Sequence, residues 1–115
     1  MANLESINEI LEANELEKQS TSSDGKRVVM NSRDLRDLDL RGVDFRNADL
    51  RESNFSWANL GGADMRGANL AGAVMLNADL RNALLGYADF SEADLRGSDL
   101  TGAELDGAEM WRTNL

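Results

Sequence analysis

Large apolar residues recur at every fifth position of this chain, and a small residue precedes each of them by two positions. From Leu50 to Met110 the large residue is always Leu, Phe or Met, and the small one is Ala, or Ser at 53 and 98. A period of five matches neither a helix nor a strand. Residues two apart in an extended segment share one side. Each unit therefore predicts a short extended side with its small and large residues inward, and the residue between them, mostly Asp or Asn, outward.

The two residues left over in each unit fit the central pair of a type II β-turn. The second of that pair needs a positive φ, which Gly and Asn tolerate best, and between 42 and 107 this position holds Gly seven times and Asn three times. Four such turns close a square, after which the chain advances by roughly 4.8 Å to the next coil. Residues twenty apart should then stack, so that Leu60, Leu80 and Leu100 form one interior column.

The unit A(D/N)LXX, in phase from Arg33 to Leu115, resembles the pentapeptide-repeat family. The resemblance implies an all-β solenoid, a right-handed quadrilateral β-helix of about four coils. It also implies a non-catalytic role, because most members have no assigned biochemical activity. Some members imitate duplex DNA and bind DNA gyrase or another topoisomerase, and some dimerise through their C-terminal coil.

The first 25 residues lack this repeat. Residues 3–18 predict an amphipathic α-helix, and 19–25 a polar link. The first coil of a solenoid leaves its apolar interior open, so we expect the helix to cap that end; a docking or membrane helix is the alternative. The predicted domains are therefore a capping helix with its linker, 1–25, and a repeat β-helix, 26–115.

The start of the coil is open between two positions. Val28 already follows the repeat, but Leu38 is the alternative start. Arg33 falls on an inward small-residue position, where a buried charge is costly. We therefore expect an irregular or solvent-exposed corner at Arg33.

Composition argues against an enzyme. The chain has neither His nor Cys, which removes the commonest general base and metal ligands, so we expect no active site, cofactor or metal. A net charge of −9 disfavours binding to nucleic acid or to an anionic membrane. The first residues do not read as a secretory signal, and no stretch is long enough to span a bilayer. A cytoplasmic protein is the expectation.

Departures from the repeat on outward positions mark candidate sites. Trp57, Val74 and Leu76 stand where small or polar residues are the rule and fall on one wall in adjacent coils. Such a cluster predicts a protein-binding patch; the alternative is that Trp57 merely shields Leu76. The arginines near the start of the repeat lie between acidic neighbours and predict solvated ion pairs of small value.

The last coil offers a second candidate. No capping segment follows it in this sequence, so its apolar interior is expected to be open. Two such ends could meet in a homodimer, with contacts at Met110, Trp111 and Leu115. Alternatively, side chains such as Trp111 and Arg112 fold over the end and the chain stays monomeric. The function predicted from the whole sequence is a protein–protein interaction or scaffold module with an unidentified partner. The alternative is a DNA-mimicking acidic rod that binds gyrase.

Overall fold

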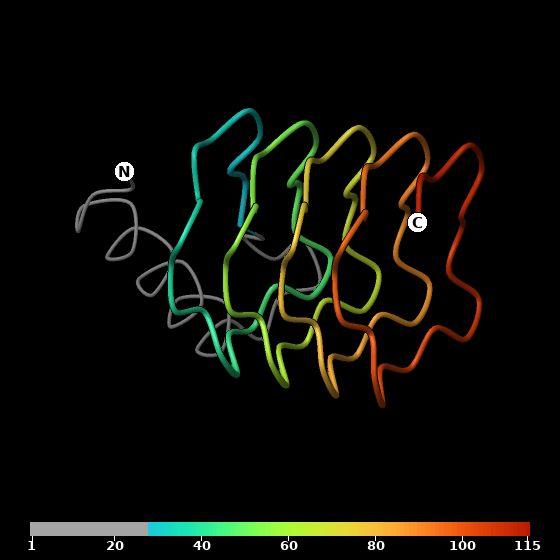
Figure 1. Ribbon diagram of the computed structural model, residues 1–115. Coiled ribbons are helices and arrows are strands. Elements are labelled where there is room, and N and C mark those ends of the chain that lie inside the picture. The colour runs from blue at the N-terminus through green and yellow to red at the C-terminus, as the bar shows by residue number, and fades with distance from the viewer. Residues whose placement is uncertain (1–27) are drawn as a thin grey trace, which may run out of the picture.

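A computed structural model describes residues 28–115 of the chain as a stack of square coils (Figure 1). The coils follow one another along the axis in sequence order, from blue at the start of the described part to red at Leu115. The predicted helix over 3–18 and the link over 19–25 lie outside the described residues. The domain division therefore stays a prediction.

Parallel pairing between residues twenty apart fixes the coil. It runs without a slip from the pair Val29 and Asp49 to the pair Asp94 and Asn114. Each link has two backbone hydrogen bonds: the Leu50 amide donates to the Asn69 carbonyl at 2.9 Å, and the Asn69 amide donates to the Ala48 carbonyl at 2.8 Å. The predicted stacking of residues twenty apart is confirmed.

Every corner has the conformation that the repeat predicts. A positive φ occurs at seventeen residues, every fifth from Ser32 to Arg112. From Val43 to Thr113 the small residue after each corner donates its amide back to the large residue before it, at 2.9 to 3.4 Å. These two features define type II turns. Seven of the corner residues are glycines, and their lack of a Cβ suits them to this conformation.

A turn in every five residues leaves only three for each side, so no strand longer than one paired residue forms in residues 28–115. The all-β prediction thus holds as a ladder of single bridges. Within these residues no helix occurs either. We name the four walls by their outward residues. The first wall holds Val29, Asp49, Asn69, Asp89 and Glu109; the second Asp34, Asn54, Val74, Asp94 and Asn114; the third Asp39, Asn59, Asp79 and Asp99; the fourth Asp44, Asp64, Leu84 and Glu104.

The core is the interior shaft. Leu60 and Leu80 are fully buried in one column, and the alanines between the walls are buried with them. Phe45 and Phe55 meet edge to face across the shaft, with ring centroids 6.3 Å apart. Burial falls in the last coil, where Leu100 is only partly buried and Leu115 is 69% exposed.

The coil is already in place at Val28, since the Val28 carbonyl accepts the Asp49 amide at 2.8 Å. The corner at Arg33, expected to be irregular or open to solvent, is open to solvent. Arg33 is exposed and its amide donates to Ser53 Oγ at 3.2 Å, while Ser32 keeps the positive φ of the other corners. Ser53 Oγ in turn donates to the Met30 carbonyl at 2.6 Å, so a buried serine bridges the two ends of this turn.

Candidate functional site

The outward Asp or Asn of each unit closes the corner that follows it. Asp44 Oδ1 accepts the Arg46 amide at 3.1 Å, and Asn59 Oδ1 accepts the Gly61 amide at 3.0 Å. Twelve outward residues make this bond to the amide two residues on. Asp and Asn are therefore interchangeable here, because either supplies the oxygen.

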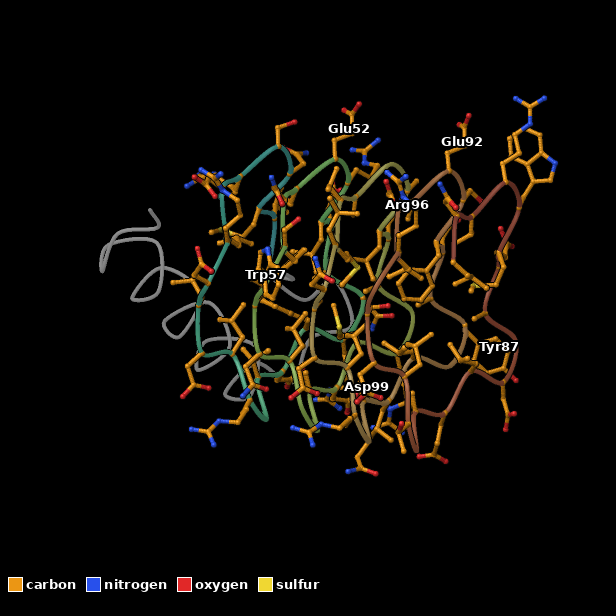
Figure 2. The ribbon with its side chains drawn as sticks, viewed as in Figure 1. Glu52, Trp57, Tyr87, Glu92, Arg96 and Asp99 are labelled. Carbon is orange, nitrogen blue, oxygen red and sulfur yellow. The ribbon has the colours of Figure 1, made fainter. Side chains whose placement is uncertain are left out.

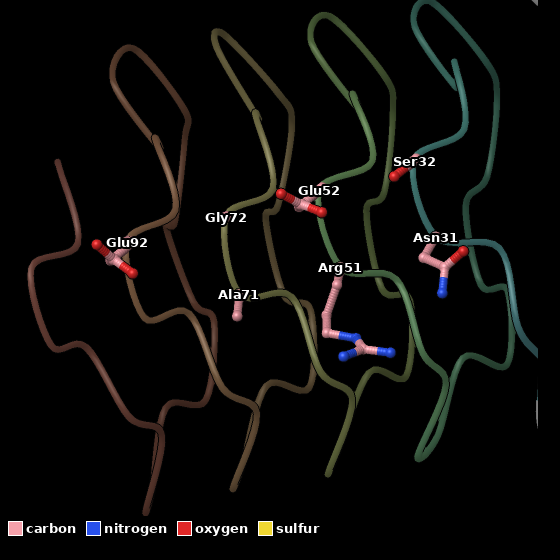
Figure 3. Close-up of a pocket in the computed structure, with 7 residues that line it drawn as sticks. All are labelled: Asn31, Ser32, Arg51, Glu52, Ala71, Gly72 and Glu92. Atoms are coloured by element: carbon pink, nitrogen blue, oxygen red, sulfur yellow. The ribbon is translucent and has the colours of Figure 1, made fainter.

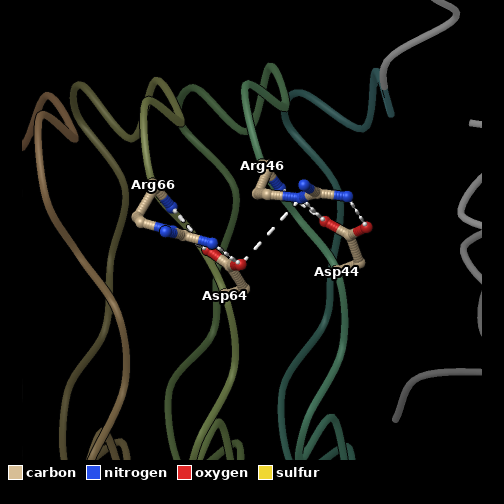
Figure 4. A network of polar contacts seen from close by, with 4 residues as sticks. All are labelled: Asp44, Arg46, Asp64 and Arg66. Carbon is tan, nitrogen blue, oxygen red and sulfur yellow. Dashed lines mark hydrogen bonds and ion pairs between the residues drawn. The ribbon is translucent and has the colours of Figure 1, made fainter. Parts of the chain in front are cut away.

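Wherever Asp is followed two residues later by Arg, the two side chains also form a bidentate ion pair. In the pair Asp44–Arg46, Nε donates at 2.9 Å and Nη2 at 2.8 Å to the two carboxylate oxygens (Figure 4). Arg46 also reaches Asp64 of the next coil at 3.9 Å, which links it to the pair Asp64–Arg66. Seven pairs of this kind occur in the described part of the chain, with carboxylates 34, 39, 44, 49, 64, 79 and 94.

These pairs hold the carboxylates ionised. Hydrogen bonds from Arg41 lower the pKa of Asp39 to about 2. Those from Arg51, helped by Asn31, lower the pKa of Asp49 to about 2. In each of the seven pairs, the Nε and Nη2 edge of the arginine is occupied by its own carboxylate.

Charge is consequently uneven along the axis. Residues 28–87 carry eight acidic and seven basic side chains, for a net charge of −1, whereas 88–115 carry seven acidic and two basic, for −5. The position two residues after the outward residue, which is often Arg in the early coils, holds another residue in most units of the later coils. The negative charge of the described coils is therefore concentrated at their C-terminal end.

The predicted patch of Trp57, Val74 and Leu76, here called the apolar wall patch, is assembled on the second wall and the corner after it. The Trp57 amide donates to the Leu76 carbonyl at 2.9 Å, which sets the two in adjacent coils. Trp57 is 65% exposed, and the other two are half-buried. Leu76 lacks the usual Asp two residues before it; its amide donates instead to the buried Ser56 Oγ at 3.2 Å.

Two bulky aromatic residues occupy corner positions where Gly or Asn is the rule. Trp57 has φ 64° and Tyr87 has φ 60°, a conformation that costs a residue with a Cβ roughly 1–2 kcal/mol. Both side chains are largely exposed, on different parts of the surface (Figure 2). Neither is placed there by the needs of the core.

A groove runs along the corner between the first and second walls (Figure 3). Ala71 and Gly72 form its low centre, and Glu52 and Glu92 stand on the coils to either side. Both glutamates are exposed. The groove is therefore an open surface feature with a carboxylate on the coil to either side.

The predicted dimer residues lie at the open end of the last coil. Trp111 is 62% exposed, Leu115 is exposed and Met110 is partly buried. The Arg112 guanidinium lies 4.7 Å from the centroid of the Trp111 ring. The indole is thus held beside the neighbouring guanidinium. The structure contains no second copy, so the dimer stays a prediction.

No group of three or more metal-ligating side chains occurs in residues 28–115. No helix in that range is long and apolar enough to cross a membrane. The bidentate pairing was not predicted, although its signal, Asp-x-Arg in phase with the repeat, occurs seven times in the sequence. Leu84 and Tyr87 also depart from the repeat, at an outward and a corner position.

Comparison with known proteins agrees with this architecture. The family model for pentapeptide repeats matches eight copies, over residues 34–67, 48–86 and 84–115. No curated protein matched the sequence. Pentapeptide-repeat proteins fold as right-handed quadrilateral β-helices, and the square coil of residues 28–115 is this architecture.

Among solved structures, HetL of the cyanobacterium Nostoc, a protein involved in heterocyst differentiation regulation, is 33% identical with a TM-score of 0.58 over 73% of this chain and 45% of its own. Rfr23 of the cyanobacterium Cyanothece is 31% identical with a TM-score of 0.65 over 82% of this chain and 67% of its own. QnrB1, a plasmid-mediated fluoroquinolone resistance protein, is 21% identical with a TM-score of 0.38, too distant to support an argument. The chain spans less than half of HetL.

Proposed function

We propose that this chain, which belongs to the pentapeptide-repeat family, is a non-catalytic module that docks a partner protein on the apolar wall patch. The observation that carries the proposal is the exposure of Trp57 beside Val74 and Leu76 on a wall that is otherwise polar. Exposed aromatic residues beside aliphatic ones are typical anchors of protein interfaces.

The surroundings of the patch suit an interface. Along the second wall it is bracketed by the ion pairs Asp34–Arg36 and Asp94–Arg96. An apolar centre with a charged rim is the usual anatomy of a protein contact.

A pull-down from host lysate with matched variants tests the proposal. Trp57→Ala and Leu76→Asp are expected to lose a partner that the wild type retains. Val29→Asp is the control, since Val29 is another exposed apolar side chain, 54% exposed, but lies on the first wall. Thermal unfolding of each variant shows that it is folded. Retention of every partner by both patch variants would refute this role.

A DNA-mimicking rod that binds gyrase is the second candidate. The excess charge of −5 over 88–115 favours it. Two facts weigh against it: seven carboxylates are matched by arginines, and four coils span about 20 Å, which is short of the ~34 Å turn of duplex DNA. Inhibition of gyrase supercoiling by low micromolar protein would favour this candidate over the first.

A further inference from the structure

A second apolar site lies on the fourth wall, opposite the second wall that carries the apolar wall patch. A groove opens there, lined by Arg66, Leu84, Gly86, Tyr87, Glu104 and Asp106; we call it the corner groove. Leu84 is paired between Asp64 of the coil before and Glu104 of the coil after. An aliphatic side chain is thus set between carboxylates on an otherwise acidic wall.

Three departures from the repeat in one unit create the groove. Leu84 takes the place of the outward carboxylate. Gly86 takes the place of the arginine that Arg46 and Arg66 supply in the two coils before. Tyr87 takes the place of the usual Gly or Asn. The result is a low floor with an aromatic ring beside it, where other units have an Asp–Arg pair.

The backbone and ring of Tyr87 are both held by the next coil. Its amide donates to the Asp106 carbonyl at 2.9 Å, and its ring lies against the backbone of Gly107. A Cβ built on Gly107 would fall 2.5 Å from Cε1 and 2.6 Å from Cδ1 of the ring. The ring therefore depends on the glycine beneath it, while 77% of the tyrosine remains open to solvent.

The groove is negative on balance. Arg66 is matched by Asp64, with Nη2 and Nε both donating to that carboxylate. The pKa of Arg66 is raised chiefly by this partner, and only weakly by the charge of Glu104. Glu104 and Asp106 have no ion pair within the described residues. Two carboxylates without an ion pair of their own thus lie beside a leucine and a tyrosine ring.

We propose that the corner groove binds an arginine side chain of a partner protein. The aliphatic stem of an arginine would cover Leu84, its guanidinium plane would lie on the Tyr87 ring, and its N–H groups would reach Glu104 and Asp106. Arginine suits this site because its planar cation stacks on aromatic rings and binds carboxylates through a fork of donors. This site is on a different wall from the apolar wall patch, so either proposal can fail without the other.

Nuclear magnetic resonance with a model peptide tests the proposal. The peptide acetyl-Gly-Arg-Gly-amide is titrated into the ¹⁵N-labelled protein, and acetyl-Gly-citrulline-Gly-amide serves as the neutral isostere. We expect saturable shifts at the amides of Leu84, Tyr87 and Asp106, with an affinity at least about five-fold weaker for citrulline. Equal shifts with both peptides, or shifts spread over the carboxylates of all walls, would overturn the proposal.

Matched variants locate the binding. The double variant Glu104→Gln/Asp106→Asn is expected to lose the shifts, whereas Glu92→Gln/Glu109→Gln, which removes two charges from elsewhere in the last coils, should keep them. Persistence of the shifts in the first double variant would contradict the assignment. Shifts in the groove that depend on protein concentration without peptide would also overturn it, since they would show that a second copy of the chain occupies the site.

Two glycine variants test the role of the ring. Gly107→Ala is expected to displace Tyr87 and weaken peptide binding without a change in charge. Gly62→Ala is the control, since Gly62 has a similar φ of 66° but no atom within 4 Å of its added Cβ. If both variants bind the peptide as the wild type does, the tyrosine has no part in the site.

Discussion

The pair Asp49–Arg51 allows the two roles of the outward Asp to be separated. Asp49 accepts the Arg51 amide at 3.4 Å and the Arg51 guanidinium at 2.8 Å through both oxygens. Asparagine keeps the first bond, as Asn59 and Asn69 do at 3.0 and 3.1 Å. Asp49→Asn therefore removes the ion pair, together with the 3.3 Å bond that Asn31 Nδ2 donates to Asp49 Oδ2, and Asp49→Ala removes the corner bond as well.

The expected cost follows from burial and from the pKa. A fall of the Asp49 pKa from 3.8 to about 2 corresponds to an interaction free energy of about 2.5 kcal/mol if the two groups are fully shielded from solvent. The Arg51 side chain is 52% exposed while that of Asp49 is 7% exposed, so solvent screening reduces the expected loss in Asp49→Asn to about 1 kcal/mol. Asp49→Ala should lose about 1 kcal/mol more, since the Arg51 amide loses its acceptor.

Urea unfolding at several pH values measures these losses. The folded-state pKa of Asp49 is depressed, so its contribution is fully present above pH 4 and is lost as the pH falls from about 4 to about 2. The difference between wild type and Asp49→Asn should close over that window. Asp39→Asn is the control, because Arg41 pairs with Asp39 at the same 2.8 Å but both side chains are more than half exposed. Equal losses at 39 and 49, or equal losses in Asp49→Asn and Asp49→Ala, would refute the reasoning.

Three further predictions concern the core, the patch and the open end. Leu80→Ala should lower the free energy of unfolding by about 2–5 kcal/mol and Leu100→Ala by clearly less, because only Leu80 is fully buried; urea unfolding with equal losses would contradict the burial gradient. Ser56→Ala should cost about 1 kcal/mol in the same assay, since the Leu76 amide loses its acceptor, and no loss would show that this bond contributes nothing. The end-to-end dimer should strengthen between low and high salt, because residues 88–115 carry a net charge of −5 and like charges would face each other. Light scattering on wild type and Trp111→Asp measures this, and an identical mass for both proteins under all conditions would count against the dimer.

The architecture was predictable because one geometric rule repeats without a slip. The five-residue period predicted the corners, the columns and the exposure of Arg33, whose charge falls on an inward position. The reduction of each side to a single paired residue follows from the same rule. The helix predicted for 3–18 rests on an amphipathic pattern alone, and it stays a prediction.

The surface was less predictable, since its chemistry depends on neighbours from different coils. The apolar wall patch emerged because Trp57 and Leu76 are conspicuous in the repeat and nineteen residues apart. The corner groove was not predicted, because the position of the Tyr87 ring depends on Gly107. In the sequence, Gly107 resembles any other corner glycine. The hydrogen bond from the Leu76 amide to Ser56 Oγ was also not predicted, because it joins residues of two adjacent coils.

Site-specific photo-crosslinking in the host cell tests the central proposal most directly. Benzoylphenylalanine placed at Trp57 would replace one exposed aromatic side chain by another, and the same residue at Gly62 would give a corner of similar conformation on a different wall. The proposal expects a discrete crosslinked partner from position 57 that is absent from position 62 and is lost when Leu76→Asp is added. Crosslinks that are the same from both positions, or none from position 57, would contradict docking on the apolar wall patch.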